Sequence, residues 1–336
     1  MKKKTVSFSK KSVNVFFHIL TRCNLSCRHC YINPEEHGKK TLPINVIEEW
    51  LSALLKKKQS ANVIFLGGEP TLHPELPRAV KKARALGYKS ITIDTNGYLF
   101  NDILEKISPM ELDFLSFSID GATGKTNDRI RGQGSFDACM KGIRQAVSIG
   151  FNTSLIFTVS SANIHELSMM PPLLEDLGID RFFIQVIGLR GNSDGSANNK
   201  INSANLQVSK KRWLDLIPEA ARNAAGRGII ATYPKVYLRP EEQFECAGLV
   251  ADNYFIFPNG RVYRCPLCED FPIHSLMFED NRLKSTPGIS EGDLFHLNIP
   301  EGCVMNRLIQ PENLEYTAEG KPKHKIACCL LKEEVY

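Results

Sequence analysis

The chain has 336 residues, of which 43% are hydrophobic and 24% charged, as expected for a globular protein with one large and one smaller domain. No apolar stretch approaches the roughly 18 residues of a membrane-spanning helix, so we expect no membrane contact and predict a cytoplasmic location. The formal net charge of +5 is modest, and the lysines are scattered rather than interleaved with aromatic residues, which disfavours nucleic-acid binding.

Strand-like and helix-like segments alternate from residue 13 to about residue 227. Strands are predicted at 13–20, 63–66, 90–94, 114–119, 152–159 and 181–187. Helices are predicted at 44–57, 75–86, 100–107, 135–150, 164–177 and 208–225. Six such pairs in succession indicate a parallel sheet, either open and doubly wound or a complete or partial barrel. Functional residues are then expected just past the carboxyl ends of the strands.

Three cysteines follow the first predicted strand with the spacing Cys23-x3-Cys27-x2-Cys30. Three thiols are one ligand short of a closed site, and a [4Fe-4S] cluster held by three thiolates leaves one iron open for chemistry. A structural zinc knuckle is the alternative, because His29 and His37 lie close enough in sequence to supply a fourth ligand.

The next three strand ends also carry glycine and polar residues. They are Gly67, Gly68, Glu69 and Pro70 after the second strand, Thr95 and Asn96 after the third, and Ser118, Asp120 and Arg131 after the fourth. Paired glycines allow close approach to the backbone, and Glu69 supplies an acceptor beside them. Each of these features alone fits an ordinary turn, but accident explains four consecutive strand ends poorly.

With these residues the chain resembles the radical S-adenosylmethionine superfamily. The cysteine triplet matches the cluster motif of that family, and Gly67–Pro70 matches its methionine-binding motif, over residues 13 to about 225. The resemblance implies an α/β fold, a partial (β/α)6 TIM-type barrel with the cluster at its top. It also implies that the open iron chelates S-adenosylmethionine, which one electron cleaves to methionine and a hydrogen-abstracting 5′-deoxyadenosyl radical.

The resemblance further implies roles for individual residues. Gly67, Gly68, Glu69 and Pro70 should hold the methionine end, and Thr95, Asn96, Ser118 and Asp120 should contact its methionine or ribose part. Arg131 is a candidate partner for the carboxylate, since a guanidinium pairs with it in a bidentate manner; a surface ion pair is the alternative. The backbone of His29, with Val159 and Val186, should flank the adenine.

The sequence pattern changes after Gly228. Residues 253–257 and 261–264 flank Pro258-Asn259-Gly260, which predicts a hairpin. The rest has little periodic apolar sequence and six cysteines. We therefore predict two domains, a core over 1–228 and a small cysteine-rich, twitch-like module over 229–336 that metal stabilises.

The spacing of Cys246, Gly260 and Cys265 resembles the hairpin of the SPASM/twitch subgroup, which binds auxiliary clusters, but the dense cysteine run that follows in that subgroup is absent. We expect one auxiliary [4Fe-4S] cluster, with ligands Cys246, Cys265, Cys268 and Cys303. Cys328 and Cys329 are adjacent, and one of them is an alternative ligand. A zinc ribbon is the competing interpretation.

These features predict an oxidoreductase-type radical enzyme whose substrate is a peptide or protein side chain or a small alcohol. Its expected partners are S-adenosylmethionine and a flavodoxin- or ferredoxin-type reductant. Residues 189–205, rich in Gly, Ser and Asn, are either a rim element over the substrate or a surface loop without a role. The alternative function is a zinc- or cluster-stabilised binding or electron-transfer protein. A nucleotide substrate, as in molybdenum-cofactor biosynthesis, is disfavoured because no Gly-Gly tail is present.

Overall fold

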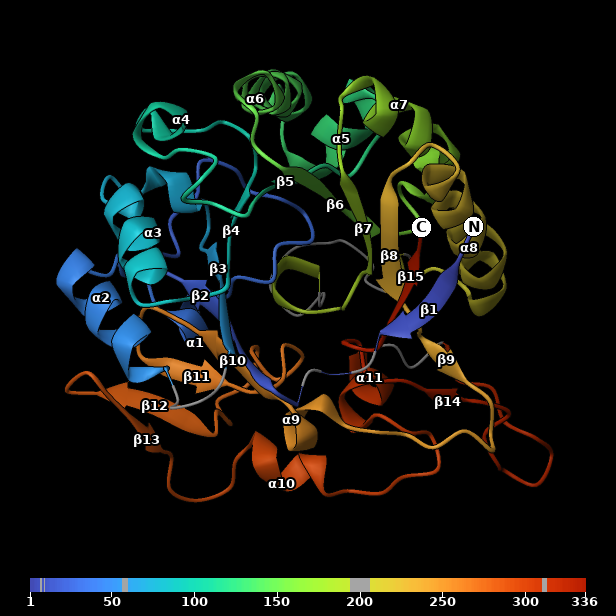
Figure 1. Ribbon diagram of the computed structural model, residues 1–336. Coiled ribbons are helices and arrows are strands. Elements are labelled where there is room, and N and C mark those ends of the chain that lie inside the picture. Colours follow the sequence, from blue (N-terminus) through green and yellow to red (C-terminus); the bar gives the residue numbers. More distant parts are fainter. Residues whose placement is uncertain (7, 9, 56–59, 194–205, 310–312) are drawn as a thin grey trace.

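The computed structural model describes residues 1–6, 8, 10–55, 60–193, 206–309 and 313–336. A curved parallel sheet forms its centre (Figure 1). Its strands in spatial order are β2 (Ser12–His18), β3 (Ser60–Leu66), β4 (Ser90–Thr95), β5 (Phe114–Ser118), β6 (Thr153–Val159), β7 (Arg181–Val186) and β8 (Ile230–Pro234). The predicted α/β fold with a partial TIM-type barrel is confirmed, and β8 is a seventh parallel strand that the periodicity did not reveal.

Helices lie along the outer face of this arc (Figure 1). They are α2 (Ile44–Ala53), α3 (Leu76–Ala85), α4 (Ile103–Lys106), α5 (Gly124–Arg131), α6 (Ser135–Ile149), α7 (Met170–Asp176) and α8 (Lys210–Ala225). The loops that connect strands and helices contain the short turns α1 (Pro34–His37), η1 (Pro70–Leu72), η2 (Ile164–Met169) and η3 (Gly191–Ser193). Helix α4 is shorter than predicted, because Asn101 and Asp102 have φ of 59° and 52° and so interrupt a right-handed helix.

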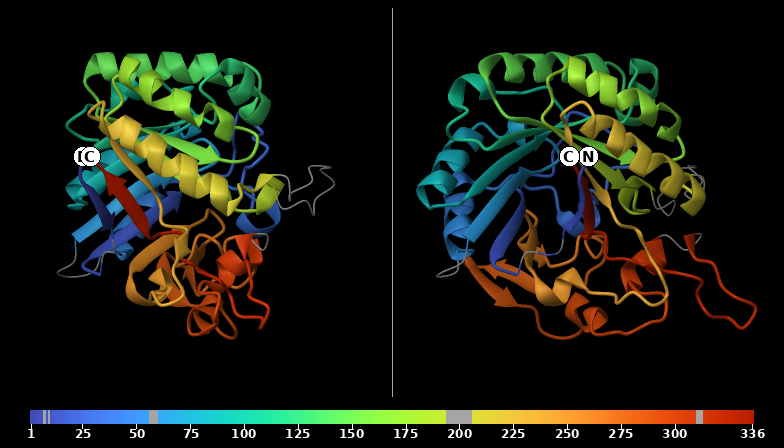
Figure 2. Two further views of the ribbon diagram at one scale, coloured as in Figure 1. Left: turned by 90° about the vertical axis from the view of Figure 1, so that its right-hand side faces the viewer. Right: turned by 45° about the vertical axis from the view of Figure 1, so that its right-hand side comes forward.

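The segment after β8 adds strands to both edges of the same sheet. On one edge β15 (Lys332–Val335) pairs with β8 and β1 (Lys3–Val6), which places the two termini side by side (Figure 2). On the other edge β10 (Asp252–Ile256) runs parallel to β2, followed by β11 (Arg261–Tyr263), β12 (Leu276–Glu279) and β13 (Arg282–Ser285). The division at residue 228 stays a prediction, since one sheet crosses it.

Alternation along the strands separates the core from the barrel interior. In β2, Val13, Val15 and Phe17 are buried, whereas Asn14 and Phe16 are half-buried. The buried set packs with the outer helices, and each such side chain contributes roughly 1.5–3 kcal/mol by leaving water. The other set points into the barrel, where the structure leaves space for a ligand.

Loops and short elements below the barrel in Figure 1 complete the chain. They include β9 (Tyr237–Leu238), α9 (Ala247–Val250), α10 (Glu291–Phe295), α11 (Val304–Ile309) and β14 (Lys325–Ile326). Within the described ranges, no helix has the length and apolar character needed to cross a membrane.

Candidate active site

A cavity of about 340 Å³ opens inside the barrel at the carboxyl ends of the parallel strands. Predicted site residues that line it are Cys23, Cys27, His29, Cys30, Gly67, Gly68, Glu69, Thr95, Asn96, Ser118 and Arg131. Val186 lines it too, whereas Pro70, Asp120 and Val159 are buried and not part of its lining. The strand ends therefore converge as the parallel topology requires.

The three thiols of the first loop lie at this cavity with few polar partners. The Cys27 Sγ is 3.8 Å from the carbonyl oxygen of Arg131, and the Asn96 Nδ2 is 3.8 Å from the Cys23 Sγ. Burial raises the pKa of Cys27 to about 12 and raises the pKa of Cys23 and Cys30. Thiolates here need a cationic centre beside them, which suits a metal cluster.

The arrangement of the ligating side chains bears on the zinc alternative. Across the described residues, no three Cys, His, Asp or Glu side chains converge closely enough to hold a single metal ion. Tetrahedral zinc requires bonds of about 2.0–2.3 Å from each ligand. Zinc at Cys23, Cys27 and Cys30 stays the alternative to a cluster.

Segment 190–193 fixes the loop that carries these thiols. The backbone N–H of Asn192 donates to the carbonyl of Cys30 at 2.9 Å, and its Nδ2 donates to the carbonyl of Cys27 at 3.0 Å. A Cβ at Gly191, which has φ of 56°, would lie 2.4 Å from the Cys30 carbonyl oxygen. Only glycine permits this approach. The remaining residues of the predicted rim element, 194–205, lie outside the described part of the chain.

The paired glycines press the strand end of β3 against the same loop. The N–H of Gly68 donates to the Leu20 carbonyl at 3.0 Å. A Cβ at Gly67 would lie 2.7 Å from the Leu20 carbonyl oxygen, and one at Gly68 would lie 2.4 Å from that of Arg22. Their first role is therefore to let the backbone before Cys23 pack closely, which the sequence did not reveal. Contact with a cofactor stays a prediction.

Glu69 organises the next strand end. Its fully buried carboxylate accepts from the Thr71 N–H at 3.1 Å, the Thr95 hydroxyl at 2.8 Å and the Asn96 N–H at 2.8 Å. Burial raises the pKa of Glu69, and these hydrogen bonds oppose that shift. The network holds Thr95 and Asn96 at the cavity wall.

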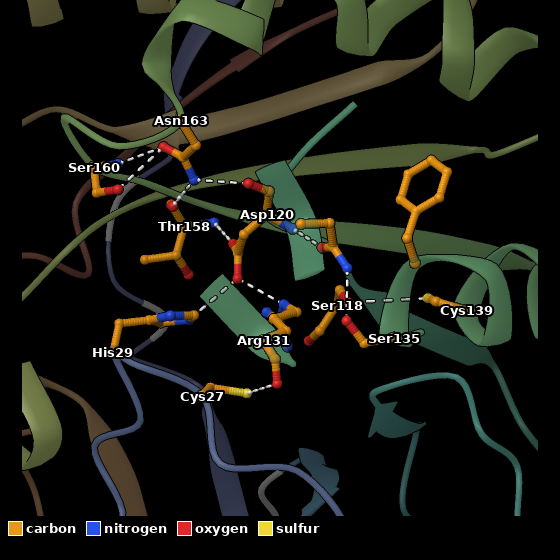
Figure 3. Close-up of polar contacts among 12 residues, drawn as sticks. Cys27, His29, Ser118, Asp120, Arg131, Ser135, Cys139, Thr158, Ser160 and Asn163 are labelled. Atoms are coloured by element: carbon orange, nitrogen blue, oxygen red, sulfur yellow. Dashed lines mark hydrogen bonds and ion pairs between the residues drawn. The ribbon is translucent and has the colours of Figure 1, made fainter. Parts of the chain in front are cut away.

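Asp120 occupies the centre of a second network (Figure 3). Its fully buried carboxylate lies 2.6 Å from the Arg131 Nε and 3.2 Å from the His29 Nε2, and it accepts from the Thr158 N–H at 2.8 Å. Burial lowers the pKa of His29, which keeps that ring neutral near pH 7. The Arg131 guanidinium thus forms an ion pair, as the alternative interpretation held, but a buried one that borders the cavity. Asp120 acts by positioning these two side chains.

Ser118 ends β5 at the cavity wall. Its carbonyl accepts from the Cys139 thiol at 3.9 Å (Figure 3). Cys139 itself is a buried core residue of α6.

Several cavity residues escaped the sequence analysis. They are His18, Tyr31, Asp94, Gln185, Arg190, Glu269, Asn306 and Lys332. Asp94 directly precedes the predicted Thr95, and burial raises its pKa to about 7, a shift that the charge of Glu69 reinforces. Its position at a strand end was a usable signal. Glu269, Asn306 and Lys332 come from the C-terminal segment, where no local pattern marks them.

The second cysteine group surrounds a separate apolar cavity of about 20 Å³. Its cysteine lining consists of Cys246, Cys265, Cys303, Cys328 and Cys329. Cys268 is buried nearby and is not part of this lining. Cys328 and Cys329, which the sequence analysis gave only as alternative ligands, therefore both line the cavity. Ligation by Cys268 stays a prediction. Cys329 also lines the main cavity, so it borders both spaces.

One ion pair joins the two cysteine regions. The Arg190 Nη1 lies 2.6 Å from the Glu269 Oε2, and its guanidinium lies 4.6 Å from the centre of the Tyr31 ring. The Tyr31 hydroxyl is 2.7 Å from the His18 Nε2. Residues beside Cys30 and Cys268 therefore contact each other through Arg190.

Comparison with known proteins identifies the class. Residues 17–170 match the family described as the Radical SAM superfamily. Residues 17–170 thus form a radical SAM domain, and this superfamily implies a [4Fe-4S] cluster together with S-adenosylmethionine.

Two curated relatives share about 30% of their aligned residues with this chain. The chain is 30% identical over 229 residues to Fe-coproporphyrin III synthase of Methanosarcina barkeri, which covers 67% of this chain and 56% of that enzyme. It is 30% identical over 218 residues to pre-heme d1 synthase of Dinoroseobacter shibae, covering 64% of this chain and 52% of that enzyme. The chain thus spans about half the length of these curated relatives.

A solved structure supports the fold over most of the chain. Streptococcus suis SuiB bound to the precursor peptide SuiA superposes with a TM-score of 0.67 at 15% identity, covering 90% of this chain and 74% of that one. This likeness includes the segment after β8 and establishes fold similarity alone.

Proposed function

We propose that Cys23, Cys27 and Cys30 hold a [4Fe-4S] cluster whose open iron binds S-adenosylmethionine. The observation that carries this proposal is the meeting of three poorly solvated thiols with the Glu69 network at one cavity. When bound, the cluster supplies the electron that cleaves S-adenosylmethionine and starts hydrogen abstraction.

The residues of the chain position the cofactor. Glu69 fixes Thr95 and Asn96 as hydrogen-bonding groups for its polar end, and the Gly67–Pro70 turn seats the cluster loop. On the opposite wall, Asp120 orients Arg131 and His29, and Ser118 supplies a further polar group. The half-buried Val186 offers an apolar surface for the adenine.

We also propose an auxiliary [4Fe-4S] cluster in the C-terminal module over 229–336, which would place the chain in the SPASM/twitch subgroup. Cys246, Cys265 and Cys303 are its ligands, with Cys328 or Cys329 a stronger fourth candidate than Cys268. Because Cys329 also borders the main cavity, a cluster here stands beside the substrate. It is suited to accept the electron of an oxidised substrate, an oxidoreductase-type reaction.

Two substrate classes have support in named relatives. SuiB is solved with a precursor peptide, in line with a peptide or protein side chain as substrate. The two curated relatives are named as synthases of Fe-coproporphyrin III and pre-heme d1. A small alcohol, which the sequence also predicted, has no such counterpart among them. A flavodoxin or ferredoxin is the proposed electron donor.

Anaerobic reconstitution with iron and sulfide tests this function. We expect about eight irons per chain, and 5′-deoxyadenosine from S-adenosylmethionine under dithionite. About four irons per chain with intact cleavage of S-adenosylmethionine would refute the auxiliary cluster but support the radical function. Bound zinc with neither iron nor cleavage would instead establish the zinc-stabilised alternative.

A further inference from the structure

Lys332 enters the main cavity from the strand nearest the C-terminus. It opens β15, where it pairs with Pro234 of β8 on one side and Val6 of β1 on the other. Lys332 and Pro234 both line the cavity. The next residue, Glu333, faces away and lies 3.4 Å from the Lys3 Nζ, as the alternation of a strand requires.

Two arginines and one lysine line this cavity, and only the arginines have an acidic partner among the described residues. Arg131 has Asp120 at 2.6 Å, and Arg190 has Glu269 at 2.6 Å. For Lys332, no carboxylate lies within ion-pair distance and no acceptor is hydrogen-bonded to its Nζ anywhere in the described ranges. Lys332 is half-buried at this wall, so a ligand in the cavity can reach an amine that no carboxylate neutralises within the described part of the chain.

Apart from Cys329, a proposed cluster ligand, the wall around the strand ends of β6 to β8 carries uncharged side chains. It includes Thr158, Gln185, Pro234, Asn306 and Leu330. Burial lowers the pKa of the Lys332 amine, and negative charge on Cys329 and Cys328 opposes that shift. An anion that enters this part of the cavity therefore meets one positive charge that no carboxylate of the described residues neutralises.

We propose that Lys332 binds a carboxylate of the substrate, so that the substrate is a carboxylate-bearing molecule. This inference rests on the radical function proposed above. A single ammonium matches the single charge of a carboxylate. A nucleoside triphosphate would bring several negative charges, and Arg131 and Arg190 are already paired. The cavity therefore disfavours a nucleotide substrate.

A carboxylate can come from a porphyrin propionate or from a peptide, and the test has one arm for each source. The porphyrin arm compares iron-coproporphyrin III with its tetramethyl ester. The peptide arm compares a terminally blocked alanine peptide carrying one glutamate with the same peptide carrying glutamine. Dissociation constants are measured by anaerobic titration of the reconstituted protein in the presence of S-adenosylmethionine.

The variants are Lys332→Met, which keeps the length of the side chain, and Lys332→Arg, which keeps the charge. Lys4→Met is the matched control, because Lys4 lies on the adjacent strand β1, is exposed and pairs with Glu334 at 2.8 Å. Melting temperatures and iron contents of all variants confirm that each is folded and loaded.

We expect at least one acid probe to bind the wild type, and its ester or glutamine counterpart to bind about tenfold or more weakly. Lys332→Met should weaken the acid by a similar factor without affecting the neutral probe, whereas Lys332→Arg and Lys4→Met retain most of the affinity. Equal binding of acid and neutral forms, no binding of either acid, or an unchanged constant in Lys332→Met would overturn the proposal.

The wild type alone separates this result from the radical function. If it forms 5′-deoxyadenosine while Lys332 fails the binding test, only the carboxylate assignment is wrong. If the wild type forms none, the proposed function itself fails, whatever the binding constants.

Discussion

The two cysteine regions differ in how the fold assembles them. Cys23, Cys27 and Cys30 lie on one short loop, which hydrogen bonds from the segments after β3 and β7 hold. The second group gathers from residues 246–329, and much of that segment has no regular structure. A site on one loop can be predicted from the sequence spacing of its cysteines. A site that distant loops share depends on tertiary packing.

The regions differ equally in their surroundings. The first group faces the main cavity beside polar networks, as an open cluster that binds a second molecule requires. The second encloses a small apolar space and reaches the main cavity at Cys329. We therefore expect the first to perform cofactor chemistry and the second to serve the substrate.

The largest expected effect comes from Cys27→Ala. Loss of one of three thiolates should abolish formation of 5′-deoxyadenosine, measured chromatographically after reduction by dithionite. Cys139→Ala is the matched control, since that thiol is buried outside both groups and should leave cleavage intact. Cleavage retained by Cys27→Ala would mean that the first region is not the catalytic one.

Cys265→Ala should separate the two regions. We expect the iron content to fall by about four per chain while cleavage of S-adenosylmethionine persists. Cys328→Ser and Cys268→Ser, compared in the same iron assay, decide the fourth ligand. Greater iron loss from Cys328→Ser would follow the cavity lining, and greater loss from Cys268→Ser would favour the sequence-based assignment.

Arg190→Met breaks the contact between the regions. It leaves the Glu269 carboxylate, which is 2% exposed, without its cation. We expect the free energy of unfolding in guanidinium to drop by about 3 kcal/mol. Adding Glu269→Gln should recover part of that loss, because the orphaned charge is removed. A loss under about 1 kcal/mol, or no recovery, would show that this pair contributes little.

His18, which contacts Tyr31 beside Arg190, should make a smaller contribution to stability that depends on pH. Its Nδ1 donates to the Ile256 carbonyl at 3.0 Å, so its Nε2 accepts from the Tyr31 hydroxyl. Burial lowers the pKa of His18 from 6.5 to about 3. The unfolded chain therefore takes up a proton first, and the stabilisation present above pH 6.5 is lost as the pH falls toward 3.

The expected loss is about 1.4 kcal/mol for each pH unit below 6.5. His18→Gln, which does not titrate there, is the reference. The difference in unfolding free energy between wild type and variant should shrink by that slope from pH 6.5 to 4.5. A constant difference would contradict neutral burial of His18.

Local patterns predicted much of the parallel sheet and the first cysteine loop. The six expected strands exist, and the residues after them meet at one cavity, because parallel strands share a common carboxyl edge. The Glu69 network follows from the same geometry.

The rest depends on contacts between distant residues. Nothing near β15 in sequence indicates that it pairs with β1 and β8, and only this pairing places Lys332 in the cavity. Arg190 and Glu269 form an ion pair although 79 residues separate them in sequence. Position 191 requires glycine because the carbonyl of Cys30 packs against it. The contribution of Cys328 and Cys329 likewise depends on how loops fold around one apolar space.

Binding of S-adenosylmethionine to an open iron can be tested by electron–nuclear double resonance on the reduced, reconstituted protein, with the cofactor labelled at its amino nitrogen and carboxylate oxygen. If the loop of Cys23, Cys27 and Cys30 holds a cluster with an open iron, the labelled atoms should show hyperfine coupling to it. Cys265→Ala should retain the coupling. A reduced cluster without coupling to either label would show that S-adenosylmethionine does not bind to an open iron of the cluster.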